Sequence, residues 1–468
     1  MQVTRRSLLQ ASMATAVAPF LPGCGRGREQ VHLLVIGAGI AGLYAARLLE
    51  QQGLKPVVIE ASERIGGRLL TLDHVPGRPE AGGQSLDAMY ARALALISEL
   101  GLEVYPRQAY LPGRAIFVNG ELVDSARWAE AQSNRLVGDE REVLPHQLAN
   151  YYLDQRNPLR NLVDWLEPRF GDYDSRALAD ELRVAGASDE AMRLMDILYD
   201  GRGLTNMSAL FAYRKRTVAR FGRGEWYRIR GGSQRLPENI ASGLANEVRL
   251  GQEVVAIRAE DDGVDVRCRD GTRYRAEFVL SSIPFSVLRH IAMQPEPPAE
   301  QMAMIRSLPY NHITQVKLGF RSRFWEQDQL PPAMISDSAF EKLAATPGED
   351  RELHVLNCWI DGQRAAEFDR LTDAEIGARV VKDIESARPA AAGQLEVLDV
   401  TAWGKNPYAR GCYHFWGPGQ IRLYGESATR PWGRVHWIGE HVATLQQGIE
   451  GAMESAEREV LAVLGRLA

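Results

Sequence analysis

Three glycines between an apolar segment and a helical one constrain the fold more than any other feature of this chain. VHLLVIGAGIAGLYAARLLEQQG (31–53) is followed by PVVIE, so a strand, a turn, a helix and a second strand succeed one another before an acid. In such a pattern the glycines allow a tight turn, close approach of a pyrophosphate, and packing of helix on strand. The helix N-terminus then faces the anion, and the acid binds a ribose. The pattern predicts a Rossmann-like dinucleotide site at Gly37, Gly39, Gly42 and Glu60.

Two further glycine loops follow this turn. ASERIGGRLLT places Gly67 and Arg68 after the second strand, and EAGGQS adds Gly82 and Gly83. Extra glycine loops indicate a cofactor larger than one nucleotide, and Arg68 can donate a charge-assisted hydrogen bond to a pyrophosphate. With these loops, the chain resembles the flavin-containing amine oxidase family, which includes monoamine oxidases, polyamine oxidases and L-amino acid oxidases.

Bulk properties limit the function classes. At 468 residues the chain exceeds one ordinary hydrophobic core, so two or three domains are expected. The net charge is −5, and Lys and Arg are dispersed, which argues against a nucleic acid partner. Past residue 25 no apolar run reaches the roughly 18–20 residues that span a bilayer. Cys268, Cys358 and Cys412 are not spaced for zinc, so no metal is expected.

The first 24 residues have the pattern of an export signal, with a charged start, a short apolar middle and small residues before a cleavage point. Adjacent Arg5 and Arg6 indicate the twin-arginine route. The segment LPGC resembles a lipoprotein processing site at Cys24, although Pro22 is unusual there, and an unprocessed tail is the alternative. We therefore expect a periplasmic or cell-envelope protein, with a lipid anchor to the membrane as a further option.

The family resemblance implies an α/β fold, in which a discontinuous Rossmann-like FAD-binding domain is joined to an α+β substrate-binding domain. The FAD-binding domain would comprise residues 31–85, 230–309 and 430–468. The substrate-binding domain would comprise residues 86–229 and 310–429, with a helical part at about 140–215. Asp262-Gly263 and Asp270-Gly271 separate alternating segments and predict a β-meander.

The resemblance also implies the FAD contacts. Val254 would hold the adenine through its backbone amide, Glu440 would contact the cofactor, and Ile449 would offer its N–H and the helix dipole to the flavin pyrimidine. The family often has an arginine where this chain has Ser62, which weakens one adenosine contact. The expected contacts are Gly37, Gly39, Ala41, Gly42, Glu60, Ala61, Gly67, Arg68, Gly82, Gly83, Gln84, Val254, Trp403, Cys412, Glu440 and Ile449.

Lys317 is the first of three expected catalytic residues. In HITQVKLGFRSRFW, strand alternation places it on one face with Ile313 and Gln315. By residue pattern alone, this is a half-buried strand with Lys317 on its wet side. The family has a lysine on this strand that holds a water against flavin N5, so the resemblance implies a buried Lys317 with a lowered pKa that assists reoxidation.

Trp403 and Tyr413 are the other two expected catalytic residues. TAWGKNPYARGCYHFW resembles the family pattern in which the tryptophan packs by the isoalloxazine and the tyrosine forms one wall of an aromatic cage. Such a cage favours cationic character by π contact, whereas ordinary aromatic packing is the alternative. Monoamine oxidases have a second cage aromatic where this chain has Gly448, so that ring is missing or supplied by another residue such as Trp416. A bulkier or more polar substrate is therefore plausible.

Cys412 immediately precedes Tyr413, where animal monoamine oxidases link a cysteine to FAD as an 8α-thioether. The resemblance therefore allows covalent FAD at Cys412. A small buried residue beside noncovalent FAD is the alternative, because free Cys is a common buried filler.

Together these features predict an FAD-dependent amine oxidase. Hydride transfer from the C–H next to nitrogen to flavin N5 would give an imine, which water hydrolyses to aldehyde and ammonia or an amine. O2, giving H2O2, or an envelope electron carrier would reoxidise the flavin. An L-amino acid oxidase is the alternative, although Gln84 lacks the adjacent arginine that binds a carboxylate there. A flavoprotein that oxidises residues of a partner protein is a further option, and the assembly is left open, with a homodimer as one option.

Overall fold

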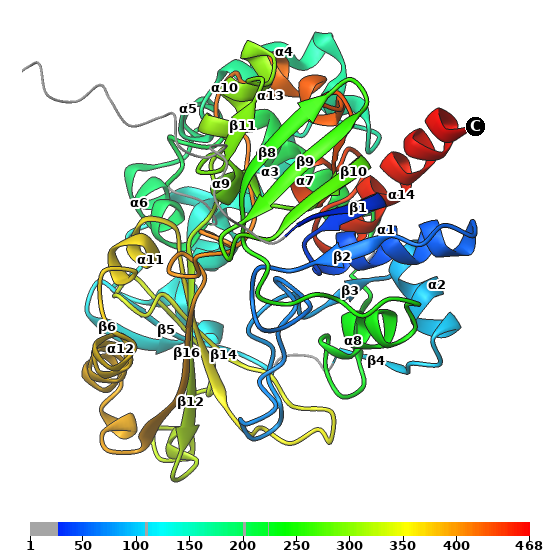
Figure 1. Ribbon diagram of the computed structural model, residues 1–468. Helices are drawn as coiled ribbons and strands as arrows, with labels where there is room; N and C mark the ends of the chain where they lie inside the picture. Colours follow the sequence, from blue (N-terminus) through cyan, green and yellow to red (C-terminus); the bar gives the residue numbers. More distant parts are fainter. Residues whose placement is uncertain (1–26, 108–110, 200–202, 223) are drawn as a thin grey trace, which may run out of the picture.

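The computed structural model describes residues 27–107, 111–199, 203–222 and 224–468 (Figure 1). The predicted export signal, with Arg5, Arg6 and Cys24, lies outside these residues. Within them, no helix is both long and apolar enough to cross a membrane. The chain forms two sheet-based units and a group of helices, and the predicted α/β class is confirmed.

The first unit is built on a seven-stranded sheet in the order β11-β8-β9-β10-β1-β2, with β17 beside β10. Residues Leu33–Ile36 are buried because β1 runs in parallel between β2 and β10 with both faces covered. The predicted meander is confirmed as three antiparallel neighbours, β8, β9 and β10. The strands are β1 (Arg28–Ile36), β2 (Val57–Ile59), β8 (Val254–Glu260), β9 (Gly263–Cys268), β10 (Arg273–Ser281), β11 (Ala292–Gln294) and β17 (Val435–Trp437).

Helices α1 (Ile40–Gln51) and α14 (Gly448–Leu467) pack against each other on this sheet, and α8 (Arg235–Ser242) packs on α1 (Figure 1). Residues 86–106 join the same core, because Leu86, Ala93 and Leu96 pack with α1 and α14. The expected division at residue 85 therefore does not follow the packing. The elements concerned are β3 (Leu86–Asp87), α2 (Ala91–Glu99) and β4 (Val104–Pro106), which with β7 (Trp226–Ile229) form a three-stranded sheet beside α2.

The second unit holds a seven-stranded sheet in the order β16-β12-β15-β14-β13-β5-β6, at the lower left of Figure 1. Its pairs are antiparallel except β13 with β5. Apolar residues of α11 (Gly362–Phe368) and α12 (Asp373–Ala387) belong to the same buried core as the strands. The strands are β5 (Ala115–Val118), β6 (Glu121–Asp124), β12 (Ile313–Phe320), β13 (Met334–Ser336), β14 (Lys342–Ala345), β15 (Leu356–Asp361) and β16 (Leu395–Ala402).

The helices between β6 and β7 cover the expected helical region and extend it to Phe221. They are α3 (Leu148–Arg156), α4 (Gly171–Ser175), α5 (Leu178–Val184), α6 (Asp189–Leu198) and α7 (Ala209–Phe221). Three short helices lie elsewhere: α9 (Phe285–Leu288), α10 (Ala299–Ser307) and α13 (Gln420–Tyr424). The 3-10 turns are η1 (Ser125–Glu130), η2 (Gly138–Glu142), η3 (Pro145–Gln147), η4 (Asp164–Leu166), η5 (Pro168–Phe170), η6 (Phe324–Glu326), η7 (Pro389–Ala391), η8 (Ser427–Thr429) and η9 (Glu440–Val442).

Candidate active site

A cavity of about 560 Å³ runs through the first unit to the segment that follows β16. Gly37, Gly39 and Glu60 line it at the carboxyl ends of β1 and β2, whereas Trp403 and Tyr413 line it elsewhere. The first group forms what we call the nucleotide end. The second group, with Cys412 and Gly448, forms the ring end.

The glycine turn at the nucleotide end has the geometry that an anion needs. A Cβ on Gly42 would lie 1.9 Å from the Gly37 carbonyl oxygen, so only glycine lets α1 start this close to β1. Gly39 caps α1, and within the part of the chain that the structure describes no side-chain cap bonds the N–H groups of the first turn. Those N–H groups and the positive end of the helix dipole therefore suit a pyrophosphate.

Glu60, at the end of β2, is buried, and neighbouring groups donate hydrogen bonds to both of its carboxylate oxygens. Its Oε2 accepts from Ala38 N at 2.8 Å, and its Oε1 accepts from Ser62 N at 2.9 Å and from Ser62 Oγ at 2.8 Å. Each carboxylate oxygen can accept two hydrogen bonds, so Oε2 retains a lone pair for a ribose hydroxyl. Ser62, which stands where the family often has an arginine, thus holds the acid in place.

Arg68, which is half-buried, and Glu440, which is buried, form an ion pair in the cavity wall. Arg68 Nη1 lies 2.9 Å from Glu440 Oε1 and also donates to the Cys412 carbonyl. Glu440 Oε2 lies 2.7 Å from His414 Nδ1. Burial alone would raise the pKa of Glu440, but the charges of His414 and Arg68 hold that pKa well below its ordinary value. One Arg68 nitrogen is therefore committed to the protein, and the rest of its guanidinium lines the cavity.

The ring end is formed by the segment after β16. Trp403 is buried, and its Nε1 donates to the Ala81 carbonyl at 2.7 Å. Tyr413 Oη accepts from Asn311 Nδ2 at 3.0 Å. Both rings line the cavity with Cys412, as the pattern of the segment predicts.

Trp416 does not supply a second cage ring. It is buried in the apolar core beside His414, with ring centroids 6.0 Å apart, and is not part of the cavity lining. Gly448, which stands in the second cage position, does line the cavity. The ring end therefore has a tyrosine on one wall and a glycine where the second ring would be.

Lys317 lies on β12 outside the lining of this cavity. Its Nζ donates to the Glu80 carbonyl at 2.7 Å, to Gln315 Oε1 at 2.6 Å and to Asn357 Oδ1 at 2.9 Å, which uses all three ammonium protons. It is 1% exposed, so placing it on the wet side of a half-buried strand is wrong. The predicted lowering is confirmed, because burial lowers the pKa of Lys317 to about 7.

Hydrogen bonds link Lys317 to the ring end, although its backbone lies further along β12. Trp403 N donates to the Ile313 carbonyl, so the ring end lies at the start of β12. The Lys317 backbone is four residues further along, roughly 14 Å at about 3.4 Å per residue. Its Nζ nevertheless donates to the Glu80 carbonyl, next to the Ala81 carbonyl that accepts from Trp403 Nε1. Gln315 lies between Ile313 and Lys317, and its Nε2 donates to the same Ala81 carbonyl as Trp403.

The remaining predicted contacts divide into two groups. Residues that line the cavity are Ala41, Ala61, Gly67, Gly83, Val254 and Ile449. Gly82 and Gln84 lie outside the lining, and a Cβ on Gly82 would meet the Arg68 carbonyl oxygen at 2.0 Å, so Gly82 serves loop packing. The sequence analysis missed lining residues after β10, namely Ser282, Ile283, Pro284, Val287 and His290. Their position after a buried parallel strand is a signal that could have found them.

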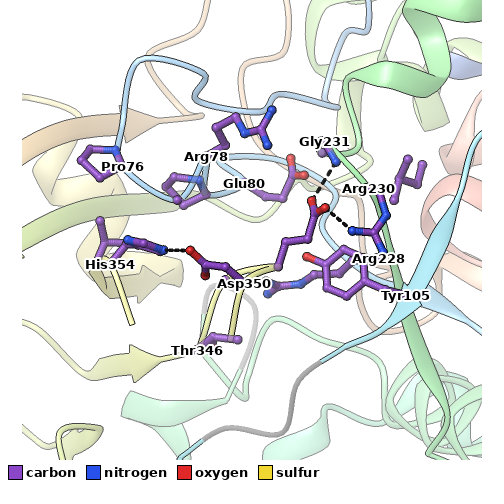
Figure 2. A pocket seen from close by; sticks show the side chains of 17 residues that line it. Pro76, Arg78, Glu80, Tyr105, Arg228, Arg230, Gly231, Thr346, Asp350 and His354 are labelled. Atoms are coloured by element: carbon purple, nitrogen blue, oxygen red, sulfur yellow. Dashed lines mark hydrogen bonds and ion pairs between the residues drawn. The ribbon is translucent and has the colours of Figure 1, made fainter. Parts of the chain in front are cut away.

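A second hollow, of about 370 Å³, lies between the two units. Figure 2 shows the side chains that line it, among them the ion pairs of Arg230 with Glu349 and of His354 with Asp350. Glu80 lines this hollow, and burial raises the pKa of its carboxyl to about 7. Since the Glu80 carbonyl accepts from Lys317, the hollow backs onto that lysine. Within the described part of the chain, no group of acids, histidines and cysteines could hold a metal ion.

Comparison with known proteins agrees with this geometry. A family model described as flavin containing amine oxidoreductase matches residues 40–464. Amine oxidase [flavin-containing] A of Canis lupus familiaris is 27% identical, with 93% of this chain and 86% of the relative covered. An L-amino acid dehydrogenase of Synechocystis sp. is 23% identical, with 93% and 95% covered. The solved cyclohexylamine oxidase of Brevibacterium oxydans is 22% identical with a TM-score of 0.79, covering 93% of this chain and 99% of that one.

The lowered pKa of Lys317 predicts a pH dependence of stability. Between its native pKa of about 7 and its ordinary value of 10.5, the unfolded chain keeps a proton that the native chain has released. Rising pH therefore favours the native state by up to about 1.4 kcal/mol per pH unit. We expect Lys317→Met to remove this contribution from urea unfolding curves between pH 7 and 10. The exposed control Lys382→Met should keep the wild-type slope, and equal slopes in all three proteins would contradict the assignment.

Proposed function

The chain belongs to the flavin-containing amine oxidoreductase family, and we propose that it binds FAD in the cavity and oxidises an amine at a carbon–nitrogen bond. The product is an imine, which water hydrolyses to an aldehyde and ammonia or an amine. When bound, FAD supplies the two-electron oxidation.

The observation that carries the proposal is one cavity with chemically different ends. Its nucleotide end offers helix N–H groups and the Glu60 carboxylate, which suit a pyrophosphate and a ribose. Its ring end offers Trp403 and Tyr413, which suit a flat ring system and a substrate beside it. Both ends belong to the same hollow, so a single extended cofactor can occupy them together.

The residues of the ring end position the substrate and exclude water. Tyr413 presents its π face, which stabilises cationic character at a neighbouring amine. Its ring is fixed because the hydroxyl accepts from buried Asn311. Gly448 contributes no side chain to the lining, so we propose a substrate bulkier than a flat arylalkylamine.

An L-amino acid substrate is the second candidate, because an L-amino acid dehydrogenase and an L-amino-acid oxidase are among the relatives. No arginine adjoins Gln84, and the next one along the chain, Arg92, is paired with Glu450 and Glu457 of α14. Arg92 is thus committed to α14. This pairing favours amines over amino acids.

We further propose that the protein acts in the periplasm or cell envelope, exported by the twin-arginine route. Support comes from Arg5-Arg6 and from the LPGC segment, whose Cys24 would carry a lipid anchor. The electron acceptor in that compartment is O2, which yields H2O2, or an envelope carrier. Cell fractionation tests the location.

Turnover of an amine panel tests the proposed activity. We expect anaerobic amine to bleach the flavin absorbance near its visible maxima, and amino acids to do so at least about tenfold more slowly. Tyr413→Ala should raise KM and lower kcat/KM by about tenfold or more, because it removes an aromatic wall. Tyr424→Ala, at a half-buried tyrosine outside the cavity lining, is the control for loss of a tyrosine. Bleaching by amino acids alone would overturn the amine assignment.

We also propose that Cys412 carries FAD covalently through an 8α-thioether. Support comes from its place in the cavity lining next to Tyr413. Acid precipitation should then leave the yellow colour in the pellet of wild-type protein, and Cys412→Ala should release it to the supernatant. Cys268→Ala, which removes a buried thiol elsewhere, should behave like wild type. Yellow supernatant from the wild type would show that Cys412 only packs against the cofactor.

A further inference from the structure

The loop at residues 443–447 delivers α14 to the ring end of the cavity. It follows η9 and ends at Gly448, which has φ +57° and lines the cavity together with Ile449. The backbone of this loop is largely buried, so its polar groups need partners within the protein. Two charged side chains from different parts of the chain provide them.

Glu454, in the second turn of α14, accepts hydrogen bonds from the N–H groups of the loop. Its Oε1 accepts from Thr444 N at 2.8 Å, and its Oε2 accepts from Leu445 N at 3.0 Å and from Gln446 N at 2.9 Å. The Thr444 hydroxyl donates to Oε1 as well, at 2.7 Å. A single buried carboxylate therefore fixes three consecutive residues, and charge-assisted bonds of this kind are the stronger ones.

Arg214, on α7, donates hydrogen bonds to the carbonyl groups of the same loop. Its Nη2 lies 3.3 Å from the Ala443 oxygen, 3.3 Å from the Thr444 oxygen and 3.2 Å from the Gln446 oxygen. The guanidinium lies over the Trp165 ring, 4.0 Å from its centroid, and the residue is 1% exposed. Arg214 belongs to the group of helices between β6 and β7, whereas the loop leads into α14 of the first sheet unit.

The two charges act on the backbone between them. Among the described residues, no carboxylate lies within ion-pair distance of Arg214, and Glu454 is the main charge that supports its protonated form. Burial lowers the pKa of Arg214 to about 10, so it stays charged at neutral pH. The loop thus lies between a buried cation and a buried anion, each bonded to backbone groups of one polarity.

We infer that Arg214 and Glu454 are positioning residues that clamp this loop and set Gly448 and the first N–H groups of α14 for the cofactor. The inference rests on the proposed function, since it assigns the clamp a role in holding flavin. The inference also makes α7 part of the cofactor site, because Arg214 connects this helix to the loop that holds the flavin.

The test uses full-length chains carrying Cys412→Ala, so that FAD is exchangeable. We expect Arg214→Met and Glu454→Gln each to raise the FAD dissociation constant about tenfold, the order expected for lost charge-assisted bonds. Each should also shift the visible absorption maxima of bound flavin and make its midpoint potential more negative, because the helix N-terminus no longer stabilises reduced flavin. Arg214→Lys keeps the charge and should fall between wild type and Arg214→Met.

Arg388→Met is the control for loss of a buried arginine. Arg388 is also fully buried, lies over the Phe324 ring and donates to the Pro331 and Leu330 carbonyls. Unlike Arg214 it is also paired with Asp328, and it belongs to the second sheet unit. It should lower the thermal unfolding midpoint and leave flavin affinity, spectrum and potential unchanged.

Three outcomes separate the claims. If Arg214→Met and Glu454→Gln are folded and keep the parent's FAD affinity, spectrum and potential, the clamp is overturned and the proposed function stands. If Arg388→Met changes the three flavin readouts as much as Arg214→Met does, loss of a buried arginine explains the effect and the clamp is overturned. If the parent protein takes up no FAD, the proposed function itself fails.

Discussion

The ion pair between the half-buried Arg68 and the buried Glu440 is the interaction on which the assembly of the site depends. It joins the loop after β2 to the loop after β17, and through the Cys412 carbonyl and His414 it also fixes the segment after β16. The loop after β2 lies more than three hundred residues from the other two segments, so no local structure could bring them together. Removing Arg68 would leave the buried Glu440 carboxylate without one of its two charged partners, which is unfavourable because a buried charge needs compensation.

At several places around the cavity, charged side chains hold irregular backbone in place through hydrogen bonds. Glu60 fixes its own loop through Ser62, and Arg214 with Glu454 holds the loop before α14. Loops that approach a cofactor expose N–H and carbonyl groups, and buried backbone groups need partners. Charged partners satisfy several groups at once and make stronger hydrogen bonds than neutral ones. The positions of the glycines and of the helix N-termini follow from these contacts.

Local patterns predicted the nucleotide half well. The β1–α1–β2 unit and the meander β8–β9–β10 follow from apolar periodicity and from turn residues, which act over a few positions. The burial of Lys317 was harder to predict, because alternation along β12 gives the face of a side chain but not the loop around Glu80 and Ala81 that covers it. Residues 86–106 pack with α1 and α14 through tertiary contacts that no local signal records. Arg214 was missed for the same reason, since its meaning depends on a loop more than two hundred residues away.

The central claim is that one FAD spans the cavity from the Gly37–Gly42 turn to Tyr413. The most direct measurement is the FAD content of the purified full-length protein, from its visible absorbance and protein concentration, together with FAD titration of any unloaded fraction. The account predicts a yellow protein that saturates at one FAD per chain. Substituting Gly39→Val should abolish this binding in a chain that still folds, because its side chain would project toward the pyrophosphate site. A folded, colourless wild-type chain that takes up no FAD on titration would contradict the account.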